Sequence, residues 1–290
     1  MKKALFLCDP GTVENAIPIT KRIVAEIQGA LGIDELHENY CEQGRVSYSP
    51  TDTLREFFQK ASANDILLLF VMCHGGTADE LLVSDEADGK DETFKFGEWL
   101  FTDDEIRRYI GLAPTGCSIF YYSAACFNGS PADLPVHYTY DKTNHVMKRN
   151  TAADSDETLK LPLFNNVISL SDTVDLKENY FVKTPYSDLS GYCFPLMAYL
   201  YQNRAQLEQN HFAEYSLRDF FMEYGKHMAK RDQAITIGVT NDTLIDAKPM
   251  ILFATRNDSI EGAEAPNQDL VPKPLVPVIE TLKRKWWCAC

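Results

Sequence analysis

The feature that most constrains the fold is an unbroken apolar run, Ile66–Cys73, which contains no charged or polar-uncharged side chain apart from its final thiol. Such a run is typical of a strand buried on both faces, as in parallel sheets. Shorter apolar runs recur along the chain, and segments with helical spacing separate them. This alternation predicts an α/β protein with three layers, α/β/α, around a mostly parallel sheet of about six strands.

Further apolar runs and turn signals supply the other expected elements. The remaining strand candidates are Ala4–Cys8, Cys117–Tyr122, Val167–Leu170, Ala234–Val239 and Met250–Phe253. Helices are expected over residues 17–31, from near Thr53, from near Thr102, over Tyr192–Gln202 and from near Ser216. Residues 81–83 and 93–96 flank an acidic turn and predict a β-hairpin.

The periodic pattern stops between residues 130 and 160. This stretch is polar and predicts a long exposed loop, which is either mobile and cut near its basic residues or uncut and solvated. After Arg256 the chain is rich in proline. We therefore expect one domain over residues 1–256, followed by a tail over residues 257–290.

Charge and hydropathy limit the function classes. The formal net charge is −14, which repels phosphate backbones and suits basic partners, so we expect no nucleic-acid binding. No apolar run approaches the roughly 20 residues of a membrane span. The N-terminus also lacks the apolar region and cleavage site of a signal peptide. A cytoplasmic location is expected.

The chain has eight cysteines, at positions 8, 41, 73, 117, 126, 193, 288 and 290. They form no Cys-x-x-Cys pair and no zinc-finger spacing, so a structural zinc site is not expected. Cys8, Cys73 and Cys117 lie in apolar runs and are interpreted as small core residues.

Two residues with catalytic chemistry follow neighbouring strand candidates. His74 comes directly after Ile66–Cys73, and Cys126 follows Cys117–Tyr122. Open α/β sheets place active sites at the carboxyl ends of their strands. A histidine can promote thiolate formation and later protonate a leaving amine. The small side chains of Ala124 and Ala125 let a substrate backbone approach, and Gly75 leaves space for an amide N–H that faces a developing oxyanion. Each residue taken singly also fits a purely structural role.

These motifs resemble those of the caspase-like cysteine peptidases, which comprise caspases, metacaspases and bacterial relatives. In that family an apolar strand ends in His-Gly, and the next parallel strand ends in a catalytic cysteine. His74 and Cys126 are 52 positions apart, close to the roughly 50 typical of caspases. The resemblance covers about residues 1–255.

The resemblance implies a cysteine endopeptidase that acts on protein or peptide substrates through a thioester, with no organic cofactor. His74 and Cys126 correspond to the catalytic dyad, and the amides of Gly75 and Cys126 to the oxyanion donors. Caspases have Gln-Ala-Cys-x-Gly and metacaspases Asp-Ala-Cys-x-Ser-Gly, whereas this chain has Ala124 two residues before the cysteine. Because of this departure, a catalytically silent scaffold or regulator stays open as an alternative.

The same resemblance suggests how the side chain before the scissile bond of a substrate would be recognised. In caspases, arginines bind the aspartate of the substrate. One arginine comes from the loop after the first strand, and one lies near the strand that follows the cysteine. The corresponding stretches here offer Asp9 and Asp172, and a carboxylate-lined pocket would favour Arg or Lys in the substrate. Alternatively, Asp9 caps a turn and Asp172 faces solvent.

Other features have weaker chemistry. Acidic loops bind calcium in some metacaspases, but the acidic segment Ser84–Glu92 lacks the ligand register of an EF-hand, which favours a solvated hairpin turn over a calcium site. His137 and His145 could bind a metal, but exposed loop histidines are usually solvated, and this interpretation is favoured for both. A flavodoxin-like binding domain, in which His74 and Cys126 would lie well apart, is a further alternative.

The C-terminus ends in Cys288-Ala289-Cys290, which resembles the doubly prenylated tails of Rab-type GTPases. A basic cluster over residues 283–285 and two tryptophans at 286 and 287 precede it, as suits an anionic membrane surface. The sequence thus allows lipidation at Cys288 and Cys290 and membrane association through the tail, including a role as a lipid-anchored adaptor. The alternative is a frayed tail with incidental cysteines.

Overall fold

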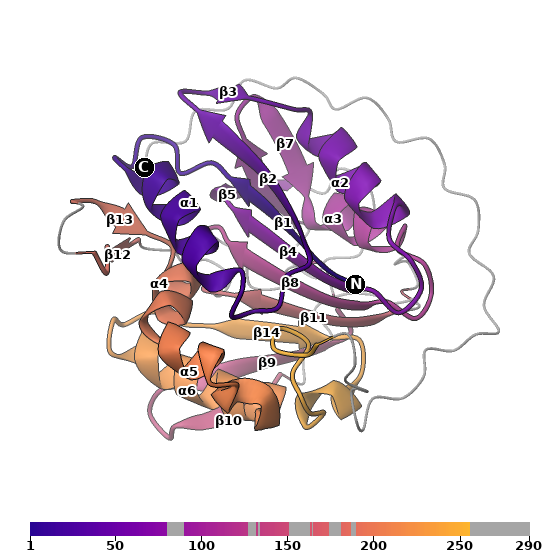
Figure 1. Ribbon diagram of the computed structural model, residues 1–290, viewed down its shortest axis with the longest axis vertical. Helices are drawn as coiled ribbons and strands as arrows, with labels where there is room; N and C mark the ends of the chain where they lie inside the picture. Colours follow the sequence, from indigo (N-terminus) through magenta and orange to yellow (C-terminus); the bar gives the residue numbers. More distant parts are fainter. Residues whose placement is uncertain are drawn as a thin grey trace.

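The computed structural model describes residues 1–79, 90–126, 132, 134–150, 163, 165–173, 181–186 and 190–255. A single large sheet of nine strands runs through it (Figure 1). In spatial order these strands are β10 (Val146–Arg149), β9 (Val136–Asp141), β14 (Thr236–Val239), β11 (Asn166–Ser171), β8 (Ser118–Ala124), β4 (Ile66–Met72), β1 (Lys2–Cys8), β2 (Glu35–Glu42) and β3 (Arg45–Val46).

The sheet is mixed and has nine strands, whereas a mostly parallel sheet of about six strands was expected. Strands β2, β1, β4, β8 and β11 run parallel to their neighbours in this group. The other strands, β3, β14, β9 and β10, each pair antiparallel. The prediction missed strands without apolar runs: β2 contains Glu35, His37 and Glu38 and is half exposed, because it lies near one edge of the sheet. The α/β class is confirmed, and the predicted strand number is wrong.

Helices cover both faces of the sheet (Figure 1). The six α-helices of the described residues are α1 (Ala16–Ile27), α2 (Pro50–Gln59), α3 (Asp103–Ile110), α4 (Pro195–Gln202), α5 (Arg204–Glu208) and α6 (Leu217–Ala229). Apolar side chains of α1, α4 and α6 pack on one face, and those of α2 and α3 on the other. Strand β4 serves both layers, since Leu68 and Phe70 point to the first and Leu67 and Leu69 to the second.

The predicted helix starts near Thr102 and Ser216 are confirmed. Thr102 caps α3 with Glu105, and Ser216 caps α6 with Asp219, each through a reciprocal capping box. The helix predicted from near Thr53 begins earlier. Ser49 caps α2 instead, because Pro50 occupies the first helical turn, where its missing N–H costs nothing.

The expected hairpin is confirmed in part, through its second strand. Strands β5 (His74–Asp79), β6 (Lys90–Phe96) and β7 (Trp99–Thr102) form a small antiparallel sheet. The second predicted strand, residues 93–96, is confirmed, whereas residues 81–83 lie outside the described residues. The hairpin begins at His74, so that this candidate catalytic residue is the first residue of β5.

The predicted exposed loop over residues 130–160 is wrong for residues 134–150, which contain β9 and β10 and extend the main sheet. The reason lies in the alternation of β9, which buries Tyr138 and Tyr140 and turns His137 and Thr139 the other way. An ideal Cβ on Gly225 of α6 would lie 2.4 Å from the Tyr140 ring, so glycine makes this contact possible. Residues 151–160 lie outside the described residues, as does the predicted domain boundary at 256.

The C-terminal end of the described chain packs against its beginning. Met250–Phe253 was expected to be a strand, but the structure has a buried turn there. The buried Lys2 ammonium donates to the carbonyls of Leu252 and Ala254, at 2.8 and 2.9 Å. The minor elements are β12 (Val182–Lys183), β13 (Tyr192–Cys193) and the 3₁₀ turns His211–Glu214 and Asp242–Ile245. Among the described residues, no helix is both long enough and apolar enough to cross a membrane.

Candidate active site

Adjacent parallel strands bring the two candidate catalytic residues to one edge of the sheet. Met72, the last residue of β4, pairs in register with Ala124, the last residue of β8. His74 and Cys126 each lie two residues beyond this pair, and neighbouring strands are about 4.8 Å apart. The carboxyl ends of β4 and β8 therefore place both side chains in the same region, as the sequence predicts.

A small cavity connects the two residues. Its volume is about 30 Å³, enough for about one or two water molecules. The described residues that line it are Cys73, His74, Ala124, Cys126, Phe181, Phe194 and Pro195. The histidine and the thiol thus share one cavity, and an apolar wall from the start of α4 closes part of it.

Gly75 packs directly against the backbone of Cys126. An ideal Cβ on Gly75 would lie 2.1 Å from the Cys126 carbonyl oxygen and 2.7 Å from the Cys126 amide nitrogen. Real Cβ atoms do not approach backbone atoms so closely, so only glycine fits at this position. The predicted oxyanion donors, the amides of residues 75 and 126, are therefore in neighbouring positions.

The loop after β1 lies against His74 and depends on Asp9. An ideal Cβ on Gly11, where φ is +61°, would lie 2.1 Å from Nε2 of His74. The Asp9 carboxylate accepts hydrogen bonds from the N–H of Gly11 at 3.0 Å and from the N–H of Gly97 at 2.6 Å. Asp9 is buried. It ties the β1 loop to the turn between β6 and β7 and does not line the cavity.

Cys126 differs from the other cysteines of the described residues. Five are buried, namely Cys8, Cys41, Cys73, Cys117 and Cys193, whereas Cys126 is partly exposed. Burial raises the pKa of Cys41 to about 12 and that of Cys117 to about 11, and it raises the pKa of Cys73 well above the usual value. Because the thiolate is the reactive form, these buried thiols are poor nucleophiles. Cys126 is the described cysteine best placed to react.

Asp172 is buried and bonded to two tyrosines. Its carboxylate accepts hydrogen bonds from the hydroxyls of Tyr122 in β8 and Tyr224 in α6. Burial raises the pKa of Asp172 to about 7, although both hydroxyls act in the opposite direction. Neither Asp9 nor Asp172 lines the cavity, so the described residues do not form the predicted carboxylate-lined pocket. Ala124 does line it, as expected.

The raised pKa of Asp172 predicts a specific pH dependence of stability. The native state binds this proton more tightly than the unfolded chain, where the pKa is near 3.8. The stabilising contribution is therefore complete below pH 4 and is lost as the pH rises to about 7. Asp172→Asn cannot ionise. Relative to wild type, we expect its free energy of unfolding to rise by about 2 kcal/mol between pH 5 and pH 7.

Urea denaturation of both proteins at pH 5, 6 and 7 measures this difference. Tyr224→Phe serves as the companion variant, because it removes one hydroxyl that stabilises the carboxylate, raises the native pKa further and should extend the loss of stability above pH 7. Parallel pH dependences of the wild type and Asp172→Asn would contradict the assignment.

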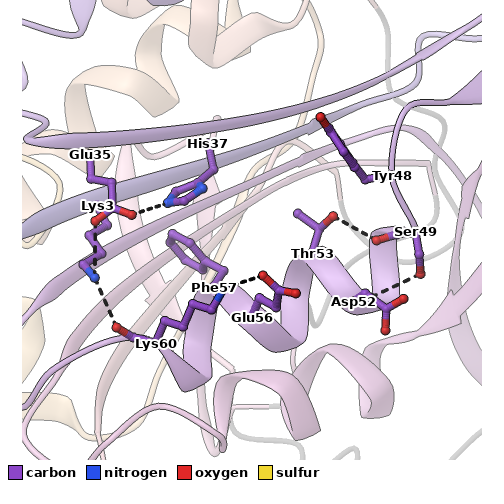
Figure 2. A pocket seen from close by; sticks show the side chains of 10 residues that line it. All are labelled: Lys3, Glu35, His37, Tyr48, Ser49, Asp52, Thr53, Glu56, Phe57 and Lys60. Carbon is purple, nitrogen blue, oxygen red and sulfur yellow. Dashed lines mark hydrogen bonds and ion pairs between the residues drawn. The ribbon is translucent and has the colours of Figure 1, made fainter.

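A larger cavity of about 410 Å³ lies elsewhere, between the start of β2 and helix α2 (Figure 2). Its lining residues are Lys3, Glu35, His37, Tyr48, Ser49, Asp52, Thr53, Glu56, Phe57 and Lys60. The ion pairs around it are Lys3–Glu35, Asp52–Arg55 and Glu56–Lys60, and His37 is hydrogen-bonded to Glu35. Lys3 is the second residue of β1 and Glu35 the first of β2, so this cavity lies at the opposite strand ends from His74 and Cys126.

Sequence reasoning missed the other half of the candidate site. Phe181 and Phe194 wall the cavity, and Pro195 begins α4 there. Thr173 follows β11 and reaches the peptide before Cys126. The only signal in the sequence for this side of the cavity was the pair Phe194-Pro195. This pair is typical of a helix start, because proline is well tolerated in the first turn of a helix.

The remaining predicted site residues add no further group to the candidate active site. His145 accepts or donates a hydrogen bond at Tyr140, 2.8 Å away, and His137 lies on β9. No cluster of three or more His, Cys, Asp or Glu side chains within the described part of the chain could hold a metal ion. Most of the acidic segment 84–92 and both C-terminal cysteines, Cys288 and Cys290, lie outside the described residues.

Comparisons with known proteins indicate the fold and no activity. No family profile matches this chain, and no curated protein matches it. Among solved structures, the chain is similar to the crystal structure of protein GSU0716 from Geobacter sulfurreducens. The two share 15% sequence identity with a TM-score of 0.51, over 86% of this chain and 98% of that one. At this identity the similarity shows a common fold.

Proposed function

We propose that the protein is a cysteine endopeptidase in which His74 and Cys126 form the catalytic dyad. One observation carries the proposal: the partly exposed thiol of Cys126 and the imidazole of His74 line one cavity at the carboxyl ends of adjacent parallel strands. Active sites of open α/β sheets occupy this position. The caspase-like resemblance of the sequence around both residues supports the same chemistry.

The proposed reaction proceeds in two steps. His74 takes the proton of the Cys126 thiol, and the thiolate attacks the carbonyl carbon of the scissile peptide bond. The N–H groups of Gly75 and Cys126 stabilise the resulting oxyanion. The C–N bond then breaks, and His74 donates its proton to the leaving amine. Water attacks the thioester with His74 as base, which releases the carboxylic acid and restores the thiol.

The preference for substrates with Arg or Lys before the scissile bond stays a hypothesis. Burial of Asp9 and Asp172, together with their internal hydrogen bonds, argues against these carboxylates as its source. The described wall of the cavity is uncharged, since Ala124, Phe181 and Phe194 contribute to it.

The function is tested with a panel of fluorogenic peptides that vary only in the residue before the scissile bond. We expect hydrolysis of at least one peptide, with a bell-shaped pH profile, because the reaction needs both a thiolate and a protonated acid. In parallel, iodoacetamide should alkylate Cys126 faster than any other cysteine of the described residues, as located by mass spectrometry. A panel without any turnover would reject the peptidase and favour a silent scaffold.

A further inference from the structure

A threonine just beyond the neighbouring strand β11 holds the peptide group that contains the Cys126 N–H. The Thr173 hydroxyl donates a hydrogen bond of 3.1 Å to the carbonyl oxygen of Ala125. That carbonyl and the N–H of Cys126 belong to one planar peptide unit, so fixing one fixes the direction of the other. We propose that Thr173 is a positioning residue that aims the Cys126 N–H at the oxyanion. This inference rests on the proposed function.

Thr173 is itself held firmly. Its N–H donates to the hydroxyl of Ser171 at 3.3 Å, and its carbonyl accepts from the hydroxyl of Thr236 in β14 at 3.1 Å. The residue is buried, with 1% of its surface exposed. These two bonds hold the main chain of Thr173, and the Ser171 hydroxyl also lies 3.2 Å from the Thr173 hydroxyl. A residue held in this way can orient its partner reproducibly.

Thr173 acts where the strand ladder has ended. The pairing of β11 with β8 ends at Ser171 and Ser123, apart from one longer contact of 3.4 Å from the Asp172 N–H to the Ser123 carbonyl. The peptide between Ala125 and Cys126 lies beyond these pairs. Gly75 packs against its Cys126 side, and Thr173 bonds its Ala125 side. Both contacts restrict the same peptide group.

If Thr173 positions the Cys126 N–H, its loss should slow only those reactions of Cys126 in which an oxyanion forms. A general loss of stability would slow every reaction of Cys126. An N–H group lowers the barrier of acyl transfer when it is aimed at the oxyanion before the reaction begins. The hydrogen bond from Thr173 also polarises the peptide and makes its N–H a stronger donor. Alkylation by iodoacetamide forms an S–C bond as iodide leaves, and no oxyanion develops. Thr173 should therefore affect acylation of Cys126 and leave its alkylation unchanged.

The test measures both reactions of Cys126 in the full-length protein. p-Nitrophenyl acetate acylates the thiol with release of p-nitrophenolate, and iodoacetamide alkylates it. The informative pair is Thr173→Ser and Thr173→Ala, which differ only in the hydroxyl, and Thr173→Val retains the shape of threonine. Thr20→Val is the matched control, because the buried Thr20 hydroxyl also donates to a backbone carbonyl, that of Ala16 at 2.8 Å.

We expect Thr173→Ala and Thr173→Val to slow acylation about 10- to 100-fold, with alkylation changed less than about twofold. Thr173→Ser should stay within about threefold of wild type in both reactions, and Thr20→Val should leave their ratio unchanged. Equal acylation by Thr173→Ser and Thr173→Ala would overturn the inference, as would a matching loss of alkylation. A wild-type Cys126 that is alkylated but never acylated would reject both proposals. Acylation without any peptide hydrolysis would reject only the endopeptidase.

Discussion

Replacing Cys126 with alanine should reduce peptide hydrolysis to the background rate, a loss of at least about 10³-fold. Removal of a covalent nucleophile has an effect of this size because the thioester can no longer form. The side chain is partly exposed, so we expect the fold and the melting temperature to change little. The measurement is the initial rate on the best fluorogenic peptide, with thermal denaturation of the same samples.

Cys117→Ala is the control for the loss of a thiol. Cys117 immediately precedes β8, which ends two residues before Cys126, and its buried thiol donates to the Ser62 carbonyl at 3.3 Å. This variant should keep the wild-type rate and lose about 1 kcal/mol of stability, as expected for one buried hydrogen bond. Equal rates of Cys126→Ala and wild type would contradict the dyad.

Gly75→Ala should damage both the fold and the reaction. The new Cβ would lie 2.1 Å from the Cys126 carbonyl oxygen, 2.7 Å from the Cys126 nitrogen and 2.9 Å from the Cβ of Ala125. These are main-chain atoms and a β-carbon, which cannot rotate away, so the strand ends must separate. We expect a loss of about 3 kcal/mol or more in unfolding free energy and at least about 100-fold in turnover.

Gly76→Ala provides a closely matched control in the same strand. The nearest atom to its new Cβ is the hydroxyl of Thr93, 3.4 Å away, which is close to an ordinary contact. We expect a change below about 1 kcal/mol and turnover close to wild type. Urea denaturation and initial rates compare the two variants directly. Equal stability of Gly75→Ala and Gly76→Ala would show that the strand ends are not in tight contact.

The elements that the sequence predicted correctly are those with strong local signals. The run Ile66–Cys73 predicted β4 because a strand between two helical layers must be apolar on both faces. Thr102 and Ser216 predicted helix starts because a cap is satisfied within four residues. The predictions are wrong where contacts with residues distant in the sequence determine the local structure. β9 buries Tyr140 against α6, which follows it by more than 70 residues.

The sequence by itself determined the α/β class and the position of His74 and Cys126 after strands, because apolar periodicity is local information. Only the tertiary structure decided what surrounds them. It buried Asp9 and Asp172 in internal hydrogen bonds, although the sequence suggested a substrate pocket. It also brought Thr173 to the peptide before Cys126, 48 positions away. The physical reason is that burial and hydrogen-bond partners depend on which segments meet in space, and no local pattern specifies those encounters.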